Sequence, residues 1–173
     1  MVLNLFKAIT TELSGENTGK LAAFLGESNT SLAEGIGPAV ASIIAGLMNK
    51  ASTQEEALDL FNRITTGGYT ERFTNRFGEL LADEKKAADL LDSGKSILAF
   101  LFGTKQASLE KLIAATSGRT TGAASSLLAA LAPFVMGTIG KQMVSENMES
   151  HDLMNLLASQ KTFVSAKDRK SVV

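Results

Sequence analysis

The segment GPAVASIIAGLMNKAS, residues 37–52, places large apolar side chains at helical spacing and fills the positions between them with glycine, alanine and serine. Small side chains let neighbouring helices approach closely, so a helix of this composition is expected at the centre of a bundle. Pro38 removes one hydrogen bond within the helix, and we expect it to bend or interrupt the helix. This segment therefore predicts an all-α fold packed around a slender central helix.

A looser copy, APFVMGTIGKQMVS, begins at Ala132. The two copies align at a fixed offset of 95 residues, which pairs Pro38 with Pro133, Val40 with Val135, Ile44 with Ile139 and Met48 with Met143. Upstream, the offset falls to 92, which pairs Gly26 with Gly118, and then to 88, which pairs Gly15 with Gly103. Because loops tolerate insertions, these shifts are compatible with a single duplication. We predict two tandem degenerate repeats of short helices, each packed around a small-residue, Pro-kinked central helix.

The predicted organisation has a first helical repeat at residues 1–66, a charged helical connector at 67–94, a second helical repeat at 95–160 and a polar C-terminal tail at 161–173. Periodicity predicts helices near residues 2–13, 18–25, 30–50, 53–65, 69–81, 84–92, 95–102, 107–117, 122–145 and 149–160. Glycines that follow apolar runs, Gly94 among them, are expected to end helices. The polar pairs at 17–18, 29–30 and 52–53 are expected to cap helix starts, with Ser52 and Glu55 forming a capping box.

Composition excludes several classes of function. The chain carries 17 basic and 18 acidic side chains, for a formal net charge of -1, so no overall field attracts nucleic acid or an anionic membrane. The absence of cysteine excludes disulfides, a thiolate nucleophile and cysteine-based zinc sites. We therefore expect neither a cofactor nor nucleic acid as a ligand.

Two segments bear on location. Residues 1–20 lack the charged start, long apolar run and cleavage site of a signal peptide, so we interpret them as a helix and favour a cytoplasmic location. The 21 uncharged residues between Arg119 and Lys141 are long enough to span a membrane. Nine of them are glycine, serine, threonine or proline, which favours a buried helix in a soluble bundle. Membrane insertion of the two central helices remains the alternative.

The segment FLGESNTSLAEGIGPAVASIIAGLMNKASTQEEALDLFNRI, residues 24–64, resembles the bacterial YidB-like family, known as a domain of unknown function. The second half, with LIAATSGRTTG from Leu112 and LMNLLASQKTFV from Leu153, is similar to the repeat found in longer members of that family. Some of those members continue into an OmpA-like domain. The resemblance implies an all-α fold and supplies no catalytic residues. Because this sequence contains no OmpA-like segment, the resemblance gives an envelope role only slight support.

Few residues offer chemistry. His151, the one histidine, is flanked by Glu149 and Asp152. Because Glu149 and His151 are two residues apart, they do not share a helix face, and we expect a solvated histidine in place of a metal ligand. The mixed charges of LADEKKAADLLD, residues 81–92, are expected on a solvated helix face. The segments SGRTTG and GTIGK lack the spacing of a phosphate loop, and GTIGK is expected inside a packed helix. No catalytic, cofactor-binding or metal-binding residues are predicted.

Two aromatic segments are candidate surfaces. YTERFTNRF interleaves aromatic and basic residues, but Tyr69, Phe73 and Phe77 are four apart and form one helical stripe, which favours packing on the first repeat over nucleic-acid binding. AFLFG, residues 99–103, is equally consistent with a self-association surface and with an intramolecular staple.

The sequence thus predicts a non-catalytic helical protein that acts through protein–protein contacts, with an unknown protein partner or with a second copy of itself. An envelope-associated adaptor is one form of this hypothesis. A membrane-inserting helical bundle is the alternative, and a helical hydrolase centred on His151 is a minor third hypothesis.

Overall fold

The computed structural model describes residues 4–13, 15–67 and 77–163, and the regular elements within these ranges are helices. They are α1 (Leu5–Glu12), α2 (Glu16–Leu25), α3 (Asn29–Asn49), α4 (Gln54–Thr66), α6 (Phe77–Ala82), α7 (Glu84–Phe102), the short 3-10 helix η1 (Gly103–Lys105), α8 (Gln106–Ser117), α9 (Thr121–Ser145) and α10 (Ser150–Ser159). The expected all-α class is confirmed. Most of the helix expected at residues 69–81 lies outside the described residues, and its described end is α6.

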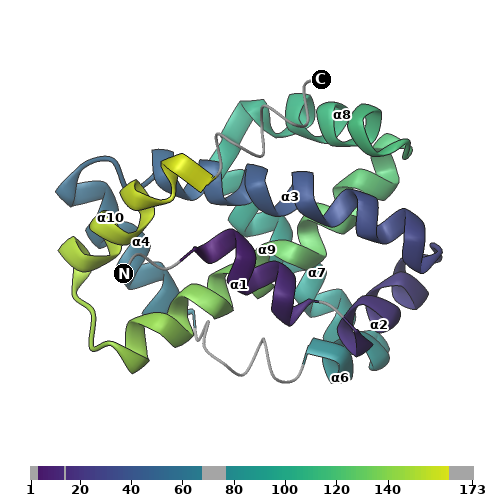
Figure 1. Cartoon of the computed structure of the whole chain (residues 1–173), viewed down its shortest axis with the longest axis horizontal. Helices are drawn as coiled ribbons and strands as arrows, with labels where there is room; N and C mark the ends of the chain where they lie inside the picture. Colours follow the sequence, from purple (N-terminus) through teal and green to yellow (C-terminus); the bar gives the residue numbers. More distant parts are fainter. Residues whose placement is uncertain (1–3, 14, 68–76, 164–173) are drawn as a thin grey trace.

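Helix α9 lies at the centre of the fold, with α7, α3 and α8 packed against it (Figure 1). Its residues from Leu127 to Gly140 are all buried, on every side of the helix. Helix α3 is buried along most of its second half, including Ile43, Ile44 and Leu47. The two small-residue segments are therefore helical and lie in the core, as their composition predicts.

Two glycines allow helices to approach more closely than a larger residue would permit. A Cβ atom added at Gly94 of α7 would lie 1.7 Å from the backbone oxygen of Ala129 on α9. A Cβ atom added at Gly46 of α3 would lie 2.7 Å from Cζ of Phe102, at the end of α7. The packing of α7 against both central helices therefore depends on the missing side chains at these two positions.

Gly94 does not end a helix, contrary to the prediction. Helix α7 continues from Glu84 to Phe102, and Gly94 is buried within it. The two helices expected at 84–92 and 95–102 are one helix, and the expected boundary between the connector and the second repeat falls inside it. The physical reason is the contact with Ala129: this position requires the absence of a Cβ atom, whereas a helix-ending glycine supplies a positive φ.

Neither central proline interrupts its helix. Helix α3 runs through Pro38, and α9 runs through Pro133. Each proline removes one hydrogen bond, but both helices are held by neighbours along their length, so packing maintains the helical course. The expected interruption is wrong, and a bend at either proline stays a prediction.

The observed caps confirm the predicted pair at 52–53, where Thr53 caps α4, but not the other two pairs, because α3 is capped by Ser28 and α2 begins after Gly15 without a side-chain cap. Ser28 caps α3 and Thr53 caps α4, each by accepting a hydrogen bond from the backbone N–H three residues later. The capping box expected between Ser52 and Glu55 is wrong. The hydroxyl groups of Ser52 and Thr53 instead donate to the carboxylate of Glu56, at 3.0 and 3.1 Å. The cap is displaced by one residue because Thr53 takes the extended backbone conformation that an N-cap requires.

Gln160 connects the two ends of the described fold. Its side chain is fully buried, and its Oε1 atom accepts a hydrogen bond of 2.9 Å from the backbone N–H of Leu5, at the first turn of α1. Its Nε2 atom donates to the carbonyl of Leu156 in α10 at 3.1 Å. A polar side chain that follows α10 thus supplies the acceptor that the start of α1 needs in a buried position.

Candidate functional site

One recess in the described part of the chain is a groove, lined mainly by apolar side chains, at the end of the molecule where α4 and α10 lie side by side (Figure 1). Its lining residues come from α4, from the last turns of α9 and from the turn that leads to α10, and we call it the α4–α9 groove. They are Phe61, Ile64, Thr65, Gly140, Met143, Val144, Asn147, Met148 and Glu149. The groove has a volume of about 670 Å³, which lies within the range of sites that take a ligand or several side chains of a partner.

The floor and the rim of the groove differ in exposure. Ile64 and Met143 are 1% and 4% exposed, so they form part of the hydrophobic core as well as the floor. Val144 is 72% exposed and presents its apolar side chain to solvent. A single exposed apolar residue is common on protein surfaces, but one that borders a recess with apolar side chains indicates a candidate binding surface.

A local turn sets the wall of the groove. Asn147 has a φ of 53°, in the left-handed region that asparagine tolerates better than most residues. The N–H of Met148 donates to the carbonyl of Met143 at 2.9 Å, and the N–H of Asn147 donates to the carbonyl of Val144 at 3.3 Å. These bonds end α9 in a Schellman-type turn, which folds Met148 and Glu149 back beside its last residues.

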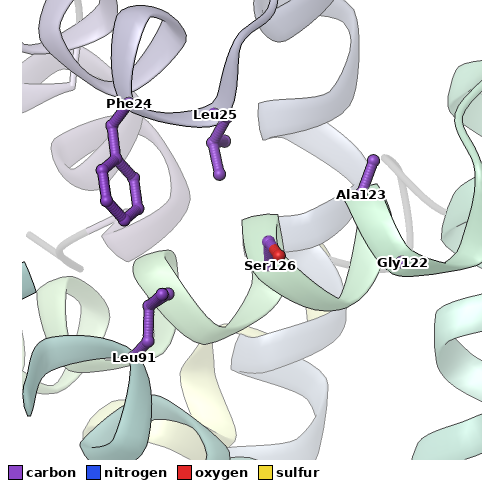
Figure 2. Close-up of a pocket in the computed structure, with 6 residues that line it drawn as sticks. All are labelled: Phe24, Leu25, Leu91, Gly122, Ala123 and Ser126. Carbon is purple, nitrogen blue, oxygen red and sulfur yellow. The ribbon is translucent and has the colours of Figure 1, made fainter. Parts of the chain in front are cut away.

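A second, smaller pocket of about 250 Å³ lies between α2, α7 and the start of α9. Figure 2 shows Phe24 and Leu25 opposite Leu91 and Ser126, and the Ser126 hydroxyl is the one side-chain heteroatom among the residues drawn there. A single hydroxyl among apolar carbons has no base or charged group beside it to activate it. This pocket is a small hollow between packed helices.

His151 lies on the surface, as expected, with its side chain 60% exposed. Its ring nitrogens lie 3.5 Å from Oε2 of Glu149 and 3.2 Å from Oδ1 of Asp152. The two carboxylates form the capping box of α10. The Glu149 side chain accepts a hydrogen bond from the backbone N–H of Asp152, and the Asp152 side chain accepts one from the backbone N–H of Glu149. Within the described residues, no group of three or more His, Asp or Glu side chains could hold a metal ion.

Other charged side chains of the described chain form ion pairs between helices or along one helix. Lys20 Nζ lies 2.9 Å from Oε1 of Glu16 one turn earlier, and this hydrogen bond holds the pKa of the Glu16 carboxyl below its usual value. Lys141 Nζ lies 3.5 Å from Oε1 of Glu12 and joins α9 to α1. Neither pair lies beside a nucleophile in a recess, which is where a perturbed pKa would indicate catalysis.

A buried ion pair between Arg119 and Glu27 was not predicted from the sequence. The Arg119 side chain is 2% exposed, and its Nε atom lies 2.6 Å from Oε1 of Glu27, whose side chain is 13% exposed. Its Nη2 atom donates to the carbonyl of Ser31 at 2.6 Å. The guanidinium group lies against Gly35, where an added Cβ atom would be 2.0 Å from Nη1. The segment SGRTTG therefore supplies a buried structural cation.

The two aromatic segments pack inside the fold where they are described. Phe77 is fully buried and meets Phe134 of α9 edge to face, with ring centroids 4.9 Å apart. The rest of YTERFTNRF, with Tyr69, Arg72, Phe73 and Arg76, lies outside the described residues.

The AFLFG segment forms an intramolecular staple. The guanidinium carbon of Arg63 lies 3.8 Å from the centroid of the Phe100 ring, and Lys50 Nζ lies 5.2 Å from it. Leu101 is buried, and Phe102 packs at Gly46. These contacts join the end of α7 to α3 and α4, and they favour the staple over a free self-association surface.

A family model described as a bacterial protein of unknown function (DUF937) matches residues 7–142. The chain belongs to the DUF937 family. No curated protein and no solved structure matched the chain.

The DUF937 match covers α2, α3, α4, α7 and α8 in full, together with most of α9. It therefore includes both small-residue central segments. It ends one residue before Met143, so the α9 end of the α4–α9 groove and the turn at Asn147 lie beyond it. Membership of DUF937 identifies a bacterial family without an assigned activity, and the function must be inferred from the molecule itself.

Proposed function

We propose that this protein is a non-catalytic α-helical protein that acts through protein–protein contacts, and that the α4–α9 groove is its contact surface. The observation that carries the proposal is the position of Val144, which is 72% exposed beside a recess floored by the buried side chains of Ile64 and Met143. An exposed apolar residue that borders an apolar recess is typical of a surface that a partner covers.

The test is photo-crosslinking in bacterial cells with a benzophenone amino acid at position 144. The matched control carries the same amino acid at Leu112, which is 60% exposed on α8 and does not line the groove. Protein adducts that form at 144 and are absent or different at 112 would support the proposal. If neither position yields an adduct, and Leu58, which is also exposed in the described part of the chain, yields none either, the proposed function is wrong.

We also infer that an internal duplication produced this chain, and the backbone at equivalent positions supports it. Gly15 and Gly103, at an offset of 88, have φ and ψ of 71° and -126°, and of 54° and -124°. Gly26 and Gly118, at an offset of 92, have 72° and 31°, and 69° and 29°. Two unusual glycine conformations thus recur in the same order, each between the helices that the sequence pairs.

The buried ion pair fits the same duplication. Glu27 and Arg119 each follow one of the paired glycines directly, so they hold equivalent positions in the two predicted repeats. A contact between equivalent positions is expected where two similar units are related by a twofold axis. We infer that the contact between the repeats descends from an interface between two copies of one ancestral unit. In this proposal the contact between the repeats is formed within one chain. The α4–α9 groove is a separate surface at one end of the molecule, where another protein could bind.

Membrane insertion is the second candidate function, and it rests on the length and composition of two helices. Helices α3 and α9 are long and apolar enough to cross a membrane by length and composition, although 56% and 78% of their apolar windows are buried within the fold. Insertion would require these helices to leave the core. Flotation of the purified protein with anionic vesicles at neutral and mildly acidic pH separates the candidates, because a contact protein of the cytoplasm stays in the aqueous fraction.

A further inference from the structure

We propose, on the basis of the function inferred above, that the α4–α9 groove binds an amphipathic helix of a partner protein that carries large apolar residues on one face and lysine or arginine beside them. The apolar part of this match comes from the floor. Ile64 and Met143 are buried, Phe61 and Met148 are half-buried, and Val144 is exposed at the edge. Methionine side chains adapt to the shape of a partner, and surfaces rich in them accept helical partners.

The charges at the rim select a cationic partner. Glu146 is exposed at the end of α9, and the side chain of Glu149 is 78% exposed. Helices α4 and α9 both end beside the groove, at Thr66 and Ser145, so their carbonyl ends add negative partial charge there. The described residues that line the groove include no lysine or arginine.

The basic residues nearest in the sequence are engaged elsewhere. Arg63 of α4 stacks on Phe100, with its guanidinium carbon 3.8 Å from the ring centroid. Lys141 of α9 pairs with Glu12 of α1 at 3.5 Å. Neither side chain pairs with Glu146 or Glu149. Because His151 Nδ1 lies 3.5 Å from Oε2 of Glu149 and Glu149 also caps α10, a partner's cation would supply complementary charge chiefly at Glu146.

The shape of the surface favours a helix over an extended peptide. An extended peptide binds most often by adding a strand to a sheet edge, and the described residues contain no strand. A helix instead places apolar anchors at positions i, i+3 or i+4 and i+7 into a groove between helices, and a volume of about 670 Å³ accommodates a few such side chains. Its flanking lysines or arginines would then lie beside the carboxylates of the rim.

The test uses fluorescence anisotropy with designed helical peptides of about five turns, roughly 18 residues. One probe has a leucine face and a lysine face, the second has the same leucine face with glutamate, and the third contains the residues of the first in an order without helical periodicity. We expect binding of the leucine–lysine helix, at least about tenfold tighter than that of the other two, and weaker binding at higher salt.

Three variants locate the binding surface. Val144→Lys should weaken binding of the leucine–lysine helix about tenfold, because it places a charge at the apolar edge, and Glu146→Lys should weaken it through charge repulsion. Leu112→Lys is the matched control, since it also introduces lysine at an exposed apolar residue, one that lies away from the groove, and it should leave binding unchanged. Glu146 is used in place of Glu149 because Glu149 caps α10. Circular dichroism confirms that each variant is folded.

Three outcomes overturn the proposal. The first is equal binding of the lysine and glutamate helices, or equal loss with Val144→Lys and Leu112→Lys. The second is a dimer of the wild-type chain that Val144→Lys dissociates, which would assign the groove to a second copy. The third is binding that appears only after Arg72 and Arg76 are changed to glutamate, which would assign the groove to the chain itself. Crosslinks at 144 combined with failure of the cationic helix would reject this partner chemistry and leave the proposed contact function intact.

Discussion

Replacing Gly94 with alanine should destabilise the protein, although alanine is the better helix former. The added Cβ atom would lie 1.7 Å from the backbone oxygen of Ala129, whereas real Cβ atoms essentially never lie closer than 3.0 Å to another heavy atom. Helices α7 and α9 would therefore have to separate by more than 1 Å at this point, or one of them would have to distort. Because the clash is with a backbone atom, no rotamer change relieves it, and truncating Ala129 to glycine would not rescue the variant.

The expected magnitude follows from two opposing effects. Overpacking of a close-packed core costs about 1–3 kcal/mol. The cost at this site should lie at the upper end of that range, because α7 and α9 pack against each other and both carry fully buried side chains, such as Leu98 and Leu128. Replacing glycine by alanine within a helix returns about 0.5–1 kcal/mol. The net loss in the free energy of unfolding should be about 2 kcal/mol, which lowers the urea midpoint by about 1 M for an m-value near 2 kcal/mol/M.

The assay is equilibrium unfolding in urea, followed by circular dichroism, with Gly19→Ala as the matched control. Gly19 also lies within a helix, but a Cβ atom there would meet nothing within 4 Å, so this variant should be stabilised by about 0.5–1 kcal/mol. The reasoning would be refuted if Gly94→Ala were as stable as the wild type while the m-value remained unchanged. The close approach of α7 and α9 would then not limit the fold.

Three further changes test interactions at other places in the fold. Arg119→Met should cost about 3–5 kcal/mol because it leaves the buried carboxylate of Glu27 without its cation, and a double variant that also carries Glu27→Leu should recover much of that loss in thermal unfolding. Gln160→Leu should cost about 1–3 kcal/mol by removing the acceptor for the Leu5 N–H, and faster hydrogen exchange at that amide would distinguish this cause from a general loss of packing. Thr53→Ala should cost about 1 kcal/mol through loss of the α4 cap, whereas a change below a few tenths in urea unfolding would show that the cap is dispensable.

Local patterns in the sequence determined the helical class. The segment from Ile43 to Met48 is helical, with Ile43, Ile44 and Leu47 buried, because periodicity and side-chain volume are properties of one segment. The positive φ at Gly26 and Gly118 could be expected for the same reason, since a helix that ends locally needs a residue that tolerates this conformation. The proposed duplication also depends on comparing segments of the sequence with each other.

The tertiary structure decided three features that depend on residues far apart in the sequence: the role of Gly94, the burial of Arg119 and the α4–α9 groove. Gly94 follows an apolar run just as Gly118 does, and only the position of Ala129 makes it a packing glycine within a continuous helix. Arg119 lies in a polar segment, and only the fold places it in the core beside Glu27. The α4–α9 groove likewise exists because α4 and the end of α9, far apart in the sequence, lie side by side with Val144 left uncovered. Burial and charge pairing between such segments arise from long-range packing, which periodicity along a single helix does not encode.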